Sequence, residues 1–131
     1  MAKQIHITAQ DRQRLLECLA VVHEFPDKRD LPHIRQLEEE IAQAQIIIDA
    51  LMTPEDVVTM NSRVQLRDVT ADRDLECTLT YPGERDPDNE SVSVLAPLGA
   101  AILGYRVGDT FVADLPEGRT QFRIESVRHR P

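Results

Sequence analysis

Apolar residues recur at helical spacing through the first part of the chain. Thr8-Ala9-Gln10-Asp11 forms a capping-box pattern, which predicts a helix that begins at Thr8. This helix is expected to end before Pro26, because proline disfavours helical geometry in the residue that precedes it. Its apolar positions fall on one face and are Leu15, Leu16, Leu19 and Val22. The first helix is therefore predicted to bury one side.

A second helix is predicted over 31–50, with Asp30 as its N-cap and Pro32 in its first turn. Its apolar residues alternate between spacings of three and four, as in an a/d heptad seam, and are Ile34, Leu37, Ile41, Ala44, Ile48 and Leu51. Residues 1–52 are thus expected to form an antiparallel helical hairpin, a short coiled coil. Ile46, Ile47 and Leu51 at its base are expected to rest on the rest of the chain.

From Thr53 onward the period changes from 3.6 to 2, which is typical of half-buried strands. The alternating apolar positions are Val64 and Leu66; Leu75, Cys77 and Leu79; Val92 and Val94; Phe111, Ala113 and Leu115; and Phe122 and Ile124. Proline and glycine in 116–118 predict a hairpin turn, and PLGAAILG over 97–104 predicts a short buried helix. The chain is expected to be α+β, with an antiparallel sheet around one short helix in residues 53–131.

Composition narrows the possible partners. The chain has 131 residues and a formal net charge of −8, from 15 Lys and Arg against 23 Asp and Glu. Direct nucleic-acid binding is disfavoured, because Lys and Arg supply most of that affinity, whereas a basic protein surface would be attracted. No apolar run reaches the length of a membrane span or forms a secretory signal, and Cys18 and Cys77 form no disulfide framework. A cytoplasmic protein-binding module without membrane contact is expected.

Motifs for catalysis or cofactor binding are missing from the sequence. It contains no P-loop and no G-x-S-x-G nucleophile elbow, and its four histidines lack metal-ligand spacing. The acidic loop 84–90 lacks the glycine and the closing glutamate of a calcium loop. We expect no enzyme activity, no cofactor, no metal and no small-molecule substrate.

Four segments in the second part carry a family resemblance. They are DVVTMNSRV (56–64), SVSVLAPLGAAILG (91–104), VGD (107–109) and LPEG (115–118). In this order they resemble the C-terminal half of the Gre transcription factors, and more closely that of the Gre-related Rnk proteins, named as regulators of nucleoside diphosphate kinase. The resemblance implies an FKBP-like second domain. One position departs from the Gre pattern, because Ala96 stands where that pattern has a serine before the proline. Prolyl isomerase activity is not expected, since the domain has few aromatic residues and no Trp.

The resemblance also implies bacterial RNA polymerase as the partner, bound at the rim of its secondary channel with the hairpin directed inward. The implied contact residues are Ala96, Pro97 and Leu98 at a strand-to-helix junction. A second candidate set is Phe25, Asp27 and Asp30 at the hairpin tip.

Gre factors stimulate transcript cleavage with carboxylates on a long coiled-coil tip, whereas the hairpin here is short. We therefore expect a non-catalytic regulator that competes with longer-armed Gre factors. One alternative is a cleavage stimulator in which Asp27 and Asp30 orient the catalytic metal ion. The other is a helical-hairpin adaptor whose partner is not polymerase.

Overall fold

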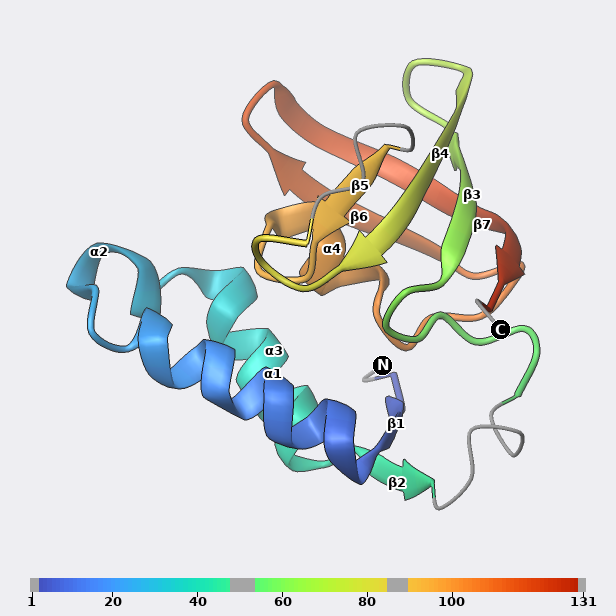
Figure 1. The fold of residues 1–131 in the computed structure, drawn as a ribbon. Coiled ribbons are helices and arrows are strands. Elements are labelled where there is room, and N and C mark those ends of the chain that lie inside the picture. The colour runs from blue at the N-terminus through green and yellow to red at the C-terminus, as the bar shows by residue number, and fades with distance from the viewer. Residues whose placement is uncertain (1–2, 48–53, 85–89, 130–131) are drawn as a thin grey trace.

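The computed structural model describes residues 3–47, 54–84 and 90–129, and Figure 1 shows a helical part lying below a curled sheet. The helical part consists of β1 (His6–Thr8), α1 (Ala9–Val22), α2 (Pro26–Arg29), α3 (Pro32–Ala42) and β2 (Gln45–Ile47). Helices α1 and α3 run in opposite directions, and α2 forms the tip between them (Figure 1). The predicted start of α1 is confirmed, because Thr8 Oγ1 accepts a hydrogen bond from the Asp11 amide at 3.1 Å.

The predicted second helix is wrong at both ends. Its N-cap is Leu31 rather than Asp30, and it ends at Ala42 rather than at residue 50. The chain then forms β2, which pairs in parallel with β1, in register His6 with Gln45. Consecutive β-branched isoleucines at 46–48 favour a strand over a helix, although the heptad spacing continues from Ala44 to Ile48. With 11 residues, α3 is shorter than two heptads, so the coiled coil is not confirmed. Ile48 and Leu51 lie outside the described residues.

The second part forms a five-stranded sheet in the order β5-β4-β3-β7-β6. The strands are β3 (Arg63–Asp68), β4 (Arg73–Thr80), β5 (Ser91–Ser93), β6 (Thr110–Leu115) and β7 (Gly118–Arg128). Most of the predicted inward-facing residues are buried, which confirms the alternation. The expectation of a purely antiparallel sheet is wrong at one edge, because β4 and β5 pair in parallel. Its likeness to FKBP domains stays a prediction.

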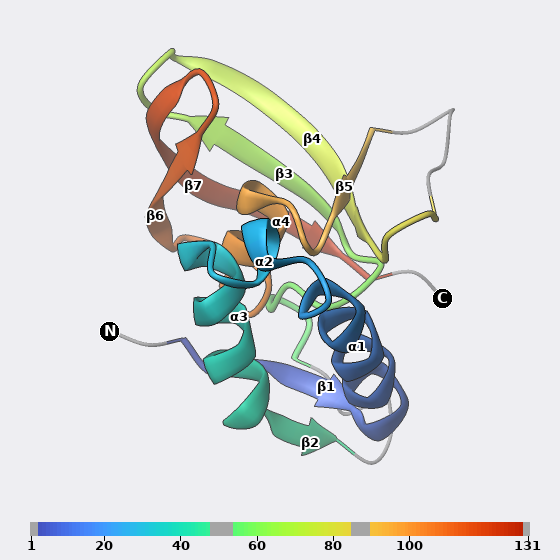
Figure 2. The ribbon, with the colours of Figure 1, turned by 90° about the vertical axis from the view of Figure 1, so that its left-hand side faces the viewer.

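Helix α4 (Pro97–Ile102) lies inside the curl of the sheet, between β5 and β6 (Figure 2). Its close approach to β5 depends on Gly99, because a Cβ added there would lie 1.9 Å from the carbonyl oxygen of Ser93. The helix is followed by Gly104, whose φ of +95° suits glycine. The predicted short buried helix is confirmed.

One hydrophobic cluster joins the helical part to the sheet. It includes Ile5, Ile7 and Leu37 from the first part and Val58 and Leu103 from the second. The predicted contact through the hairpin base is wrong for Ile46, which is 44% exposed. The side of α3 and the segment before β1 make the contact instead. The proposed domain boundary at 52/53 falls outside the described residues and stays a prediction. Among the described helices, none is long and apolar enough to cross a membrane.

Candidate partner-binding site

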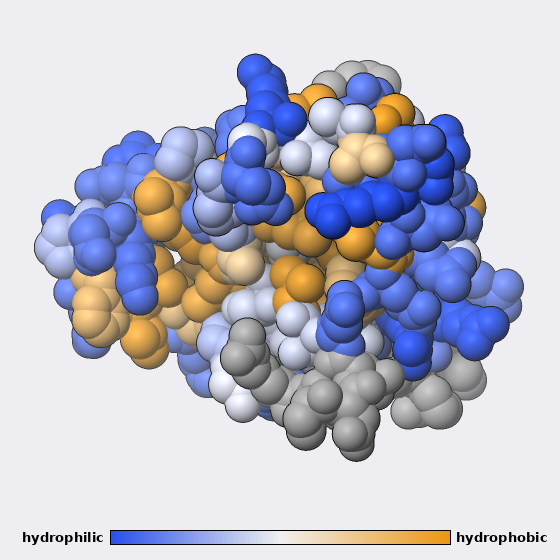
Figure 3. Space-filling model, turned by 90° about the horizontal axis from the view of Figure 1, so that it is seen from above, coloured by the Kyte–Doolittle hydropathy of each residue, from blue (hydrophilic) through white to orange (hydrophobic). Residues whose placement is uncertain are grey.

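The hairpin tip presents an aromatic ring and several charges. Phe25 precedes α2 and is 47% exposed, with Lys28 Nζ 5.5 Å from the centre of its ring. Asp27 lies in the first turn of α2 and is exposed. Figure 3 shows apolar surface at this tip, on the left of the view. The predicted tip residues therefore do reach the surface.

Asp30, the other tip carboxylate, belongs to a local ion pair. Its Oδ1 accepts a hydrogen bond from Arg35 Nη2 at 2.8 Å, and its Oδ2 lies 3.9 Å from Arg29 Nε. The hydrogen bond from Arg35, more than any other cause, lowers the pKa of Asp30. Asp30 is thus engaged with α3 instead of capping it. Among the described residues, no three His, Cys, Asp or Glu side chains are arranged to hold a metal ion.

The strand-to-helix junction is half-buried rather than fully exposed. Ala96 has the extended backbone of an N-cap, with φ −77° and ψ 155°, but no side-chain hydrogen bond to the helix. Pro97 occupies the first turn, where its missing amide hydrogen costs little. Leu98 packs against the hydrophobic core, which leaves only part of it for a partner. The absent serine therefore leaves the start of α4 without a cap.

A groove of about 560 Å³ connects the junction with the hairpin. Pro97 lines it from α4, Leu31 from the start of α3, and Leu115 from the end of β6. Figure 2 shows α3, α4 and β6 close together on one side of the molecule. Of the six predicted site residues, only Pro97 lines this groove. The groove therefore connects the junction set with the tip set only indirectly: Pro97 lines it directly, whereas the tip set adjoins it through Leu31, the residue after Asp30.

Polar contacts fix the hairpin against the sheet. The Tyr81 hydroxyl donates to Asp11 Oδ1 at 2.6 Å, and the Arg14 guanidinium lies 4.0 Å from the centre of the Tyr81 ring. Burial, and then the bond to Asp11, raises the pKa of Tyr81. His33 Nε2 lies 3.0 Å from the carbonyl oxygen of Leu95, directly before the junction. The tip is therefore held at a defined position relative to the junction.

A buried ion pair completes this attachment. Lys3 Nζ lies 3.6 Å from Glu40 Oε2 and donates to the carbonyl oxygens of Ala100 and Ala101 at the end of α4. It also lies 4.4 Å from the centre of the Tyr105 ring. Burial lowers the pKa of Lys3 to about 8 and raises that of Glu40. Glu40 Oε1 is buried without a hydrogen-bond partner among the described residues.

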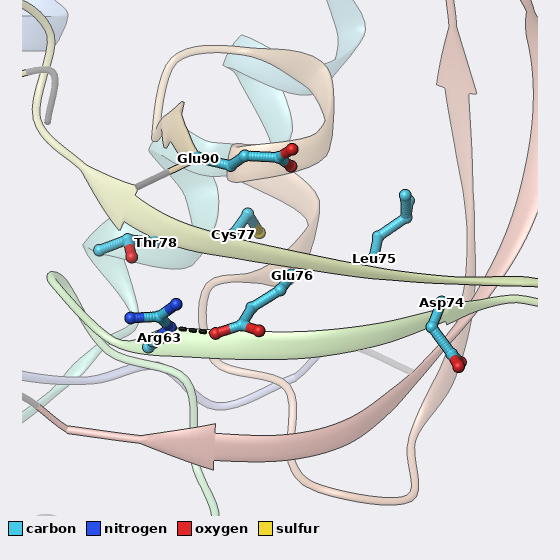
Figure 4. A pocket seen from close by; sticks show the side chains of 7 residues that line it. All are labelled: Arg63, Asp74, Leu75, Glu76, Cys77, Thr78 and Glu90. Carbon is cyan, nitrogen blue, oxygen red and sulfur yellow. Dashed lines mark hydrogen bonds and ion pairs between the residues drawn. The ribbon is translucent and has the colours of Figure 1, made fainter. Parts of the chain in front are cut away.

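A second hollow lies along β4 and has a volume of about 310 Å³ (Figure 4). Its acidic side chains are Asp74, Glu76 and Glu90, and Glu76 pairs with Arg63. Cys77 lines it too, but burial raises the pKa of this thiol to about 11, so it stays protonated at neutral pH. A neutral thiol is a poor nucleophile, so this hollow offers no evident chemistry.

Sequence reasoning missed the contacts that position the tip. Tyr81 and Asp11 are 70 residues apart, and Lys3 and Glu40 are on different elements. Neither pair has a local pattern that periodicity could detect. The sequence did contain one usable signal for this part of the fold, although not for these contacts. The run of β-branched isoleucines after Gln45 favours strand β2.

Two family models match the chain. One, described as "Transcription elongation factor, GreA/GreB, C-term", matches residues 53–129, and the other, "Rnk N-terminus", matches residues 3–47. The Regulator of nucleoside diphosphate kinase of Escherichia coli K12 is 38% identical over 116 residues, covering 88% of this chain and 85% of that protein. Transcription elongation factor GreA of Clostridium beijerinckii is 33% identical over 91 residues, covering 70% of this chain but 56% of its own length.

Solved structures agree with these matches. A GreA/GreB transcription elongation factor from Nitrosomonas europaea superimposes with a TM-score of 0.79 and 33% identity, over 98% of this chain and 100% of that one. Gfh1 of Thermus thermophilus, at 22% identity and a TM-score of 0.51 over 96% of this chain and 99% of its own, shares the fold. The chain therefore belongs to the GreA/GreB family of transcription elongation factors, with an N-terminal part of the Rnk type.

Proposed function

We propose that this chain is a non-catalytic transcription regulator that binds bacterial RNA polymerase at the rim of the secondary channel. Ala96, Pro97 and Leu98 form the main contact, and the hairpin tip with Phe25 stands in the channel entrance. There the chain competes with longer-armed Gre factors. Membership of the GreA/GreB family supports the choice of partner.

The length of the hairpin is the observation that carries the non-catalytic part of this proposal. Helix α1 has 14 residues and α3 has 11, which correspond to about 21 Å and about 17 Å at 1.5 Å per residue. The chain aligns with only 56% of the length of the Clostridium GreA protein. With arms this short, the tip is expected to stop in the entrance, before the catalytic centre.

The charge of the tip favours a non-catalytic role in the channel entrance over cleavage stimulation. A carboxylate that helps to hold a catalytic metal ion must be free to coordinate it. Asp30 is instead bonded to Arg35, and Lys28 and Arg29 place two further cations on α2. Asp27 and the nearby Glu24 remain, and two carboxylates beside these cations are a weak ligand set for a divalent ion. The tip therefore suits occupation of the channel better than metal chemistry.

Stalled elongation complexes test this proposal. The chain alone is expected to leave the transcript at full length, and in increasing amounts to suppress the cleavage stimulated by a Gre factor. Robust transcript shortening by the chain alone would mean that it is a cleavage stimulator. A pull-down in which core polymerase does not retain the chain at low salt would favour the adaptor.

Paired variants test the contact surface. Ala96→Glu places a charge at the junction, and Ala20→Glu places the same charge on the exposed face of α1. Only Ala96→Glu is expected to weaken polymerase binding and competition. Thermal melting of both variants checks that each is folded. If both variants bind polymerase equally well, the junction is not part of the contact surface.

A further inference from the structure

We propose that the open edge of β6 binds an extended peptide segment of a partner protein as an additional strand. Strand β6 lies at one end of the sheet, and among the described strands it pairs with β7 alone. An edge strand presents unpaired N–H and C=O groups that can template another strand. The groove along this edge shares Pro97 with the proposed polymerase contact, but the inference does not depend on that contact.

The hydrogen bonds of Gln121 identify the free backbone groups. Gln121 is opposite Val112 in the β6–β7 pair. Its N–H donates to Thr70 Oγ1 at 3.0 Å, and its C=O accepts from the Val69 amide at 2.9 Å. Both bonds point away from β6. In an antiparallel pair, opposite residues are either both bonded to each other or both not, so the N–H and C=O of Val112 point to the open edge.

The neighbouring bonds give the same register. The Ile124 amide donates to the Asp109 carbonyl at 2.9 Å and the Ile124 carbonyl accepts from the Gly108 amide at 2.8 Å, so both backbone groups of Ile124 point toward the β6 side. Alternation then places the backbone groups of Thr110, Val112 and Asp114 on the open side. Three residues with outward N–H and C=O groups are enough to anchor a short added strand.

The groove described above runs along this edge. Consecutive residues from Val112 to Pro116 line it, which shows that it follows the strand rather than one face of the sheet. Leu31 and Pro97 line the opposite side. Val112 is 50% exposed and Leu31 is 38% exposed, so an apolar surface accompanies the free hydrogen-bonding groups. Natural proteins usually protect such edges with charge, proline or a covering element.

The shape and charge of the groove favour a single extended chain. With six residues, β6 spans about 20 Å, so a bound peptide could pair with it over about six residues. The start of α3 walls the groove, which leaves room for one chain but obstructs a second sheet. Among the described residues, Asp114 is the one carboxylate that lines the groove, and its ion pair with Arg119, at 3.8 Å, is exposed and weak. The expected peptide alternates apolar residues and carries a Lys or Arg near Asp114.

Proline at position 112 tests the added strand. Val112→Pro removes an outward N–H but no bond to β7, whereas Val112→Thr keeps the N–H and nearly the same side-chain shape. The probe is a phage-displayed library of random peptides of about ten residues, selected on the full wild-type chain. The enriched peptides should bind wild type and Val112→Thr alike. They should bind Val112→Pro at least about tenfold more weakly, as for the loss of one or two hydrogen bonds.

Hydrogen exchange on the wild-type chain gives a second measurement that needs no variant. Binding of an enriched peptide should slow exchange of the Val112 and Asp114 amides, whereas the Phe111 amide, already bonded to β7, changes less. The inference is overturned if no peptide is enriched, if enriched peptides leave these amides unprotected, or if they bind well-folded Val112→Pro like wild type. Sedimentation that shows a wild-type dimer abolished by Val112→Pro would also overturn it, because the occupant would then be a second copy.

Discussion

Replacing Tyr81 by Phe is expected to loosen the attachment of the hairpin to the sheet. The change removes one hydroxyl and leaves the ring, which is 2% exposed and packs under Arg14. The hydroxyl donates to the Asp11 carboxylate at 2.6 Å, a short bond to a charged acceptor. The perturbation therefore acts on a single interaction between α1 and the end of β4.

The expected loss is about 2 kcal/mol. Hydrogen bonds to charged groups contribute roughly 1.5–3 kcal/mol, and the half-buried Asp11 regains part of this by contact with water. For a chain of 131 residues, an unfolding entropy of about 2.1 cal/mol/K per residue makes this a fall in Tm of about 7 °C. The protonated state of Tyr81 is secured by its raised pKa, so the loss should be constant across neutral pH.

Urea unfolding of wild type, Tyr81→Phe, Asp11→Asn and the double variant measures this contribution directly. The double-mutant cycle should give a coupling of about 1 kcal/mol or more, since the two groups are in contact. A loss below about 0.5 kcal/mol for Tyr81→Phe, with the slope on urea unchanged, would refute the assignment of this bond as a clamp.

Three further changes test other parts of the structure. Ala96→Ser supplies the missing N-cap of α4 and should raise the free energy of unfolding by about 1 kcal/mol in urea unfolding; no gain would contradict the N-cap geometry. Gly99→Ala should destabilise by more than about 3 kcal/mol, because its Cβ would lie 1.9 Å from the Ser93 oxygen, and a near-native Tm would contradict this close approach. Lys3→Met should cost about 3–5 kcal/mol at pH 7, because Glu40 is left buried without its cation. The raised pKa of Glu40 means that the folded chain takes up its proton more readily than the unfolded chain, so this cost should shrink as the pH falls through that pKa. A cost that is unchanged in Tm measurements between pH 7 and pH 5 would contradict burial of the charge.

Local patterns predicted the elements that depend on local chemistry. Thr8 as an N-cap, the alternation in β3 and the short helix after Ala96 each follow from neighbouring residues. The predicted second helix failed after Ala42, because the heptad spacing continues through Ala44 to Ile48 while the intervening isoleucines of β2 favour a strand. Pairing with β1, more than 35 residues earlier, decided between them.

The candidate site was predictable only in part. The order of the family segments placed Ala96, Pro97 and Leu98 at a strand-to-helix junction, and the structure has this junction. The groove beside Pro97 needs α3, α4 and β6 to converge, and only the tertiary structure brings them together. The same holds for the free edge at Val112, because no local pattern states which strand lies at the end of a sheet.

The shared hydrophobic cluster has a consequence for how the chain unfolds. Ile5 packs so closely on the turn after α4 that a Cβ on Gly104 would lie 2.9 Å from its Cγ1. Neither part can lose its order without exposing apolar surface of the other. The hairpin and the sheet should therefore melt in a single calorimetric transition, with equal van't Hoff and calorimetric enthalpies. Amides of α1 and of β7 should then exchange with the same global opening free energy.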